Sequence, residues 1–297
     1  MSSVGTLSQR IAAAPISWGV CEVPGWGAQL EPRRVLGEMR DLGIRATELG
    51  AIGWLPSDGA ATKTLLDEFG LSLVGGFVPL VLHDATRRDA AIDAATTAAR
   101  HLAAAGGTYF VTAAISSHAA WERPELGTAE WANLFAMLTE LDQITADHGL
   151  VQAVHPHVNT LIETASEVDR FIDNCASPFT LDTGHLYLGG ADPVMIARRH
   201  HERVALVHIK DIDARVAQMF LSGTASLMDS VAAGLFPNAG DGVAPIAATV
   251  DALHEVGYCG WYVLEQDITL TGDLPAPGEG PVLGVRSSIE YLRSLDA

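Results

Sequence analysis

The sequence predicts an α/β fold: a closed barrel of eight parallel strands alternating with helices, (β/α)8, in one domain spanning residues 1–297. Three observations predict it. Eight short apolar segments alternate with helical patterns, which is typical of a parallel sheet whose helices cover it. Four of the segments end in a side chain able to bind metal: His155, Asp182, His208 and Glu265. The first three follow at intervals of 27 and 26 residues, one strand and helix each, and the last after 57.

The strands are expected where apolar runs are short and bounded by polar or glycine residues. The helices are expected where apolar residues recur at helical spacing, and Gly43, Gly70 and Gly149 mark three of their ends. The expected strands are 11–17, 46–50, 71–78, 109–113, one from 151 that ends at 155 or 157, 179–182, one from 204 that ends at 208 or 210, and 261–265. The expected helices are 33–42, 60–69, 84–105, 128–148, 164–174, 192–201, 244–256 and 281–295.

The long interval before Glu265 predicts an insertion at about residues 211–243, after the seventh strand. Within it we expect one helix at 214–234 and a loop rich in Gly, Pro and Asn at 236–242. An open dinucleotide-binding sheet is the alternative, but no GxGxxG follows a strand in this sequence. The repeat pattern therefore favours the closed barrel.

Composition excludes several classes of function. The formal net charge is −18 and the isoelectric point is near 4.8, which argues against a nucleic-acid partner because phosphates would be repelled. Three cysteines without CxxC spacing are typical of a reducing compartment. No signal peptide or run of ~20 apolar residues is found. We therefore expect a soluble cytoplasmic protein without a membrane partner.

The strand ends predict a metal site, because polar residues at the carboxyl ends of barrel strands face one cavity. Two imidazoles and two carboxylates suit divalent Mn, Fe, Co or Zn, and a carboxylate-rich set leans toward Mn or Mg. His157 lies on the same strand face as His155 and is the alternative ligand. Three further side chains lie near the expected mouth and are candidates for substrate contact or proton transfer: Glu48, His185 and Lys210.

These motifs resemble a known family. Asp182-Thr-Gly-His185, His208-Ile-Lys-Asp211 and Glu265-Gln-Asp267, in this order on a barrel pattern, are similar to the sugar phosphate isomerase/epimerase superfamily of xylose-isomerase-like TIM barrels. With His155-Pro-His157 and the loop ending at Gly242, the likeness is closest to inosose (2-keto-myo-inositol) dehydratases. The resemblance implies Mn or Co, with Mg, Fe or Zn as alternatives, bound by Asp182, His208 and Glu265. The wider superfamily has glutamate where this chain has His155.

The resemblance implies a metal-dependent hydro-lyase that dehydrates a keto-inositol or a similar polyhydroxylated ketone through an enediolate. His157 or Glu48 would remove the α-proton, and His185 or Lys210 would help the β-hydroxyl leave. A keto-sugar isomerase or epimerase would share the enediolate and is the first alternative. A metal-free binding barrel is the second, since a fold does not fix function. The partner is a small polyol or keto-sugar, and homo-oligomerisation stays open.

Overall fold

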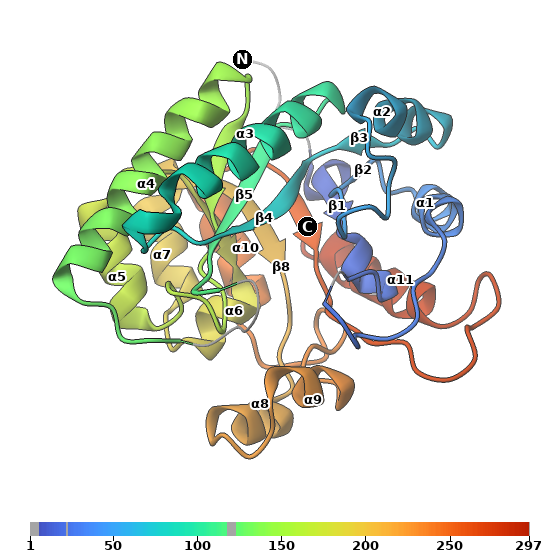
Figure 1. Ribbon diagram of the computed structural model, residues 1–297. Helices are drawn as coiled ribbons and strands as arrows, with labels where there is room; N and C mark the ends of the chain where they lie inside the picture. The colour runs from blue at the N-terminus through green and yellow to red at the C-terminus, as the bar shows by residue number, and fades with distance from the viewer. Residues whose placement is uncertain (1–5, 22, 118–122, 297) are drawn as a thin grey trace.

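A parallel sheet forms the centre of the molecule in the computed structural model, which describes residues 6–21, 23–117 and 123–296 (Figure 1). Nine strands are found among these residues, in the order β3-β2-β1-β9-β8-β7-β6-β5-β4. Every strand pair is parallel. The strands are β1 Ile11–Ala13, β2 Ala46–Thr47, β3 Ser72–Leu73, β4 Gly75–Leu80, β5 Tyr109–Ala114, β6 Val151–Val154, β7 Phe179–Asp182, β8 Val204–Ile209 and β9 Tyr262–Leu264.

The nine strands correspond to the eight expected segments, because β3 and β4 are two halves of the segment expected at 71–78. Only Val74 separates them. Its N–H donates to the Thr47 carbonyl in β2 at 2.8 Å, while its own carbonyl accepts hydrogen bonds from the N–H groups of Thr108 and Tyr109 at 2.9 Å. The segment thus touches both edges of the sheet and nearly closes it into a barrel. The predicted (β/α)8 class is confirmed.

Helices surround the sheet and follow the strands in alternation (Figure 1). Gly43 and Gly70 adopt positive φ angles of 77° and 67° just after the first two helices, as a C-terminal glycine stop requires. The α-helices are α1 Pro32–Asp41, α2 Gly59–Glu68, α3 Arg88–Ala104, α4 Thr128–Asp147, α5 Ala165–Asn174, α6 Thr183–Leu188, α7 Pro193–His200, α8 Ala214–Leu221, α9 Leu227–Ala232, α10 Ile246–Glu255 and α11 Pro281–Ser294. Short 3-10 helices cover Leu7–Arg10, Pro15–Trp18, Ala85–Arg87 and His201–Arg203.

The expectation of one helix at 214–234 is wrong, because α8 and α9 are separate helices. The chain turns at Gly223, whose φ is 70°, and Ser226 then caps α9 by accepting a hydrogen bond from the Asp229 N–H at 3.1 Å. The two helices project together beyond the end of β8 (Figure 1). The short helix α6 was also not expected, since it begins directly at the end of β7 without a connecting loop.

The barrel interior is filled by small and branched side chains. They form one buried cluster with members from β1, β2, β5, β8 and β9, together with Val74. Leu206 and Val263 belong to it, and each lies two residues before a predicted metal ligand. Alternation along a strand points His208 and Glu265 to the same inner side. The members are Ala12, Ala14, Ala46, Val74, Val111, Leu206 and Val263.

A second apolar core covers the carboxyl end of the barrel. It joins α8 and α9 to Trp26, to Val158 after β6 and to Leu188 in α6. Phe236, from the loop that leads back out of the insertion, is buried in the same cluster. This core packs above the strand ends and not between sheet and helices. Across the described residues, no helix combines the length and apolar character that crossing a bilayer requires.

Candidate metal centre

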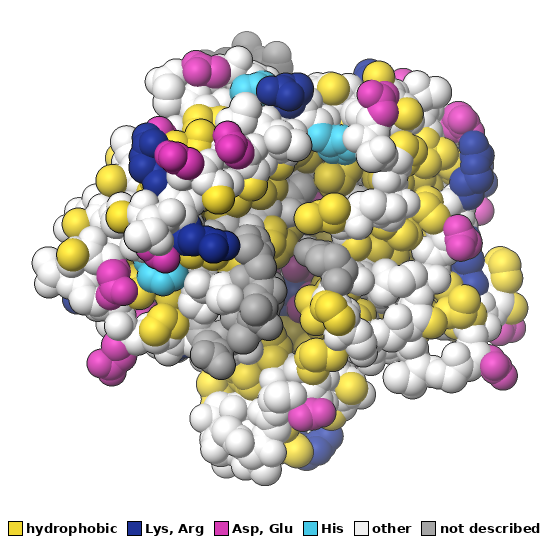
Figure 2. Space-filling model, viewed as in Figure 1, with side chains coloured by type: hydrophobic (Ala, Val, Ile, Leu, Met, Phe, Trp, Pro, Cys, Tyr) yellow, Lys and Arg dark blue, Asp and Glu magenta, His cyan; other side chains and the backbone are white. Residues whose placement is uncertain are grey.

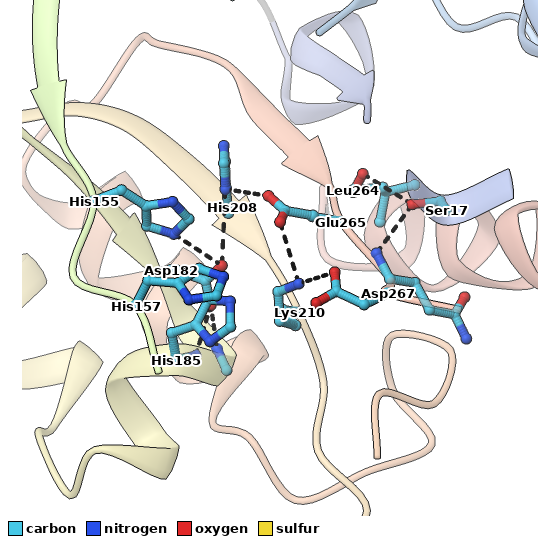
Figure 3. A network of polar contacts seen from close by, with 12 residues as sticks. Ser17, His155, His157, Asp182, His185, His208, Lys210, Leu264, Glu265 and Asp267 are labelled. Atoms are coloured by element: carbon cyan, nitrogen blue, oxygen red, sulfur yellow. Dashed lines mark hydrogen bonds and ion pairs between the residues drawn. The ribbon is translucent and has the colours of Figure 1, made fainter. Parts of the chain in front are cut away.

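Four consecutive strands bring the predicted ligands together (Figure 3). His155 follows β6, Asp182 ends β7, His208 lies in β8 and Glu265 follows β9. The register of the sheet places these strand ends at the same level, since Asp182 pairs with His208 and His208 pairs with Val263. Three overlapping sets of buried ligand atoms lie close enough to hold a metal ion: His155, Asp182 and His208; Glu48, His208 and Glu265; and Asp182, His185 and Glu265.

Asp182 uses its two carboxylate oxygens differently. Oδ1 accepts hydrogen bonds from the N–H groups of Gly184 at 2.8 Å and His185 at 2.7 Å, which caps the start of α6. Oδ2 is buried and makes no hydrogen bond with any described residue. It faces His155 Nε2 at 3.5 Å and His208 Nδ1 at 3.8 Å. A buried carboxylate oxygen without a hydrogen-bond donor, lying between two imidazole nitrogens, is suited to bind a cation.

His208 is held between two carboxylates. Its Nε2 lies 3.0 Å from Glu48 Oε1 and donates to it, because an ionised carboxylate only accepts. Its Nδ1 contacts Glu265 Oε2 and faces Asp182. Metal-binding histidines commonly donate their other N–H to a carboxylate, which fixes the ring and its tautomer. Glu48 therefore lies where it can direct His208 Nδ1 toward Asp182 and Glu265.

Lys210 lies beside Glu265 and carries the positive charge nearest to the cluster. Its Nζ is 3.2 Å from Glu265 Oε1, contacts Asp267 Oδ1, and lies 4.5 Å from the centre of the Phe236 ring. Burial alone would lower the pKa of Lys210, but Asp267 and Glu265 outweigh it and raise the pKa above its ordinary value. The ammonium group therefore stays charged.

Negative charge is in excess at the strand ends. The carboxylates of Glu48, Asp182, Glu265 and Asp267 are all buried against one lysine. Burial raises the pKa of Asp182 and brings that of Asp267 to about 6. Burial would lower the pKa of His208, yet Glu265 and Glu48 raise it well above its ordinary value. The carboxylates around His208 thus favour a positive charge, and the donor set fits a divalent cation.

Three more imidazoles line one side of the cluster, and burial lowers the pKa of each: well below the ordinary value for His155 and His185, and to about 3 for His157. All three are neutral near pH 7. The His157 Nδ1 lies 2.6 Å from the Val158 carbonyl, so this nitrogen bears the proton and the lone pair is on Nε2. The His157 and His185 ring centres lie 3.7 Å apart.

All eight residues predicted from sequence thus lie in one region, and six of them belong to the three ligand sets, with His157 and Lys210 outside them. Sequence reasoning missed two neighbours of Lys210, Asp267 and Phe236. Asp267 had a signal, because it follows Glu265 by two residues and so continues the same face. Figure 2 shows a hollow on this side of the molecule, above α8 and α9, with acidic and basic side chains visible inside it.

The alternation of strands and helices and the buried cluster agree with a known family model. The model of the xylose isomerase-like TIM barrel matches residues 36–295. The chain belongs to the xylose isomerase-like TIM barrel family. The resemblance expected from the motifs at Asp182, His208 and Glu265 is therefore confirmed.

Two relatives are similar in sequence to this chain over most of its length. The rhizopine catabolism protein MocC of Rhizobium meliloti is 34% identical over 270 residues, which are 88% of this chain and 82% of that protein. An inosose dehydratase of Geobacillus kaustophilus (strain HTA426) is 29% identical over 270 residues, 87% of each chain. The relatives are thus similar over most of the length of this chain.

Solved structures extend the likeness of fold. An L-ribulose 3-epimerase superposes with a TM-score of 0.71 at 16% identity, covering 96% of this chain and 94% of that one. The IOLI protein, solved with a zinc atom, superposes with a TM-score of 0.69 at 13% identity, covering 97% and 98%. At these identities the likeness concerns the fold alone.

Proposed function

We propose that this protein is a divalent-metal-dependent dehydratase, a hydro-lyase acting on a keto-inositol or a similar polyhydroxylated ketone. The observation that carries the proposal is the buried gathering of two imidazoles and two carboxylates at the ends of β6 to β9. The 29% identity to an inosose dehydratase supports the reaction class. The net charge of −18 fits a small uncharged substrate better than a nucleic acid, and the proposed place of action is the cytoplasm.

The proposed ligands are His155, Asp182, His208 and Glu265. His155 is favoured over His157 because its Nε2 faces Asp182 Oδ2, whereas His157 lies in none of the ligand sets. Mn or Co is the proposed ion, with Mg, Fe or Zn as alternatives. When bound, the ion would act as a Lewis acid toward the ketone and so acidify the neighbouring C–H.

The protein's own side chains would move the protons. In the proposed step a base takes the α-proton, the C–H electron pair forms the new double bond, and the β C–O bond breaks. His157 suits the base because its lone pair is on Nε2, and Glu48, the alternative, already accepts a hydrogen bond from His208. Lys210 suits the donor to the departing hydroxyl because its ammonium group is charged, whereas His185, the alternative, is neutral near pH 7 and would first have to take up a proton. The hydroxyl leaves as water.

A keto-sugar epimerase is the second candidate. The similarity of fold to an L-ribulose 3-epimerase supports it, and the enediolate would be common to both reactions. The difference is the fate of the β-hydroxyl: an epimerase returns the proton to the same carbon and breaks no C–O bond.

Incubation of the Mn-loaded protein with a keto-inositol in deuterated water tests the proposal. We expect loss of water and a new enone or dione absorbance. Deuterium uptake without dehydration would favour the epimerase. If neither occurs and elemental analysis finds no bound metal, the protein is a binding barrel. His208→Ala should abolish both metal and turnover, while His200→Ala, a surface histidine in α7, should keep both.

A further inference from the structure

Asp211 is a buried carboxylate with a different task from that of Asp182. Its side chain accepts four backbone hydrogen bonds: Oδ1 from Ile212 at 2.8 Å and Ala244 at 3.0 Å, and Oδ2 from Gly240 at 2.8 Å and Gly242 at 2.9 Å. Three of these donors belong to the loop that leads out of the insertion, residues 236–244, which we call the return loop. A charge-assisted hydrogen bond is about twice as strong as a neutral one. Asp211 therefore binds three backbone N–H groups of the return loop, while Ser288 Oγ accepts from Ala239 N at 3.0 Å and the Ile212 carbonyl from Val243 N at 2.9 Å.

The backbone of the return loop comes very close to this carboxylate. A Cβ atom built on Gly242 would overlap Asp211 Oδ1 and the Ile212 carbonyl oxygen. Only a residue without a side chain lets the loop wrap around the carboxylate at this point. The sequence thus provides both halves of the contact. Asp211 follows Lys210 directly, and Gly242 lies 31 residues after Asp211.

The return loop carries Phe236 to the proposed active site. Phe236 is buried, its ring centre lies 4.5 Å from Lys210 Nζ and 5.8 Å from the His185 ring, and its carbonyl accepts a hydrogen bond from Gln266 Nε2 at 3.0 Å. An ammonium group over an aromatic face is attracted by the ring quadrupole. Phe236 therefore contributes one of the contacts that hold the ammonium group of Lys210.

The remaining sides of Lys210 are fixed by the barrel. Glu265 and Asp267 contact Nζ, and Gly184 in α6 lies against the stem, where a Cβ would be 2.8 Å from Lys210 Cγ. Figure 3 shows Nζ pointing to the two carboxylates. The insertion supplies the aromatic side of this enclosure, and Asp211 holds the loop that brings it.

We propose that Asp211 is a positioning residue: by clamping the return loop, it keeps Phe236 against Lys210 and so fixes the ammonium group beside Glu265. The role of Lys210 in turnover rests on the proposed function, whereas the clamp itself does not. Asp211 does not touch the ligand set, and it acts through the loop.

The lysine content of the chain allows a test that needs no turnover. Lys63 and Lys210 are the only lysines, Lys63 is exposed on α2 and Lys210 is buried. Pulse labelling of the metal-loaded protein with acetic anhydride, read by peptide mass spectrometry, gives the modification of Lys210 relative to Lys63. In Asp211→Asn the amide nitrogen cannot accept, so two backbone donors lose their partner. We expect labelling of Lys210 to rise about tenfold or more as the loop opens.

Matched variants separate the clamp from a general loss of stability. Asp213→Asn changes another aspartate of the insertion, which caps α8 through the Val216 N–H at 2.8 Å and does not contact the return loop's donors. It should leave Lys210 protected. Phe236→Leu keeps an apolar side chain and removes the ring, so it should raise Lys210 labelling while the return loop keeps its amide-exchange protection.

Kinetics provide the second readout where wild type is active. Asp211→Asn should lower kcat about tenfold with KM nearly unchanged and with full metal content, because ligands and pocket remain while the ammonium group is less well placed. Equal Lys210 protection in Asp211→Asn and wild type would overturn the clamp. If wild type is inactive but Asp211→Asn still raises the labelling of Lys210, the dehydratase proposal is refuted and the clamp remains supported.

Discussion

Two buried carboxylates at the mouth of the barrel differ in how their oxygens are used. Asp211 is 2% exposed and all its capacity goes to backbone N–H groups. Asp182 is 0% exposed, yet only Oδ1 is used in this way and Oδ2 faces two imidazoles. The two side chains are equally buried, so burial does not distinguish a structural carboxylate from a metal ligand. What distinguishes Asp182 is the oxygen that receives no hydrogen bond from an N–H group.

The largest expected effect is the loss of metal affinity when Asp182 is changed. Asp182→Asn keeps an oxygen able to cap α6 but replaces the second oxygen, or its charge, at the cation site. We expect metal affinity to fall at least about 100-fold, with unfolding temperature changed little. Isothermal titration with Mn²⁺ and a thermal melt measure the two effects. Retained Mn²⁺ affinity would remove Asp182 from the ligand set.

A smaller effect is expected at Glu48, which lies one contact beyond the ligands. Glu48→Ala removes the acceptor of the His208 Nε2 proton, so metal affinity should fall about 10- to 100-fold. Glu48→Gln retains an accepting oxygen and should lose much less. The same titration checks both. Full affinity with lost turnover in both variants would instead assign Glu48 as the base.

The clamp around Asp211 is open to a steric test. Gly242→Ala places a methyl group into the Asp211 carboxylate and should destabilise the protein by about 1–3 kcal/mol. Gly37→Ala is the matched control, because it lies within α1 and its Cβ would meet only Phe69 at 3.7 Å. That change should stabilise by about 0.5–1 kcal/mol. Denaturant unfolding gives both free energies, and a neutral Gly242→Ala would contradict the close wrap.

The smallest effect concerns a third, more exposed aspartate that also binds backbone N–H groups. Asp296 accepts from Leu7 N at 2.7 Å, Ser8 N at 2.9 Å and the Ser8 hydroxyl at 2.5 Å. Burial opposes ionisation, but the hydrogen bonds from Ser8 and Leu7 together outweigh it and hold the pKa of Asp296 below its ordinary value of 3.8.

The sign of the pH dependence at Asp296 follows from that lowered pKa. Its contribution to stability is present above the unfolded pKa near 3.8 and is lost as pH falls through the lower folded value. Asp296→Asn should therefore melt below wild type at pH 7, and the difference should shrink below pH 3.8. Melting curves across this range check it. A difference independent of pH would mean that the charge of Asp296 does not matter.

The sequence was sufficient for the fold and for the place of the cluster, for physical reasons. Strand alternation puts Leu206, His208 and Lys210 on one face, and the repeat length brings the ends of β6 to β8 side by side. Both inferences depend on short-range spacing. The confirmed barrel then requires that the ends of adjacent strands meet.

What sequence could not predict depends on contacts between distant positions. Glu48 meets His208 across 160 residues, and Lys210 meets Asp267 across 57. The Asp211 clamp uses the backbone N–H groups of Ile212, Gly240, Gly242 and Ala244, which leave no pattern of side chains in the sequence. The single helix expected at 214–234 failed because Gly223 and the cap at Ser226 were hidden in a continuous helical pattern.

The contact of Asp296 with Leu7 and Ser8 has a consequence for chain connectivity. Together with the pairing of β1 and β9, it places the two ends of the described chain side by side, so a short peptide joining them would make the backbone circular. New ends opened at the exposed turn near Gly223, between α8 and α9, would leave every strand and all four ligands intact. A circularly permuted protein of this kind should still fold around the same cation.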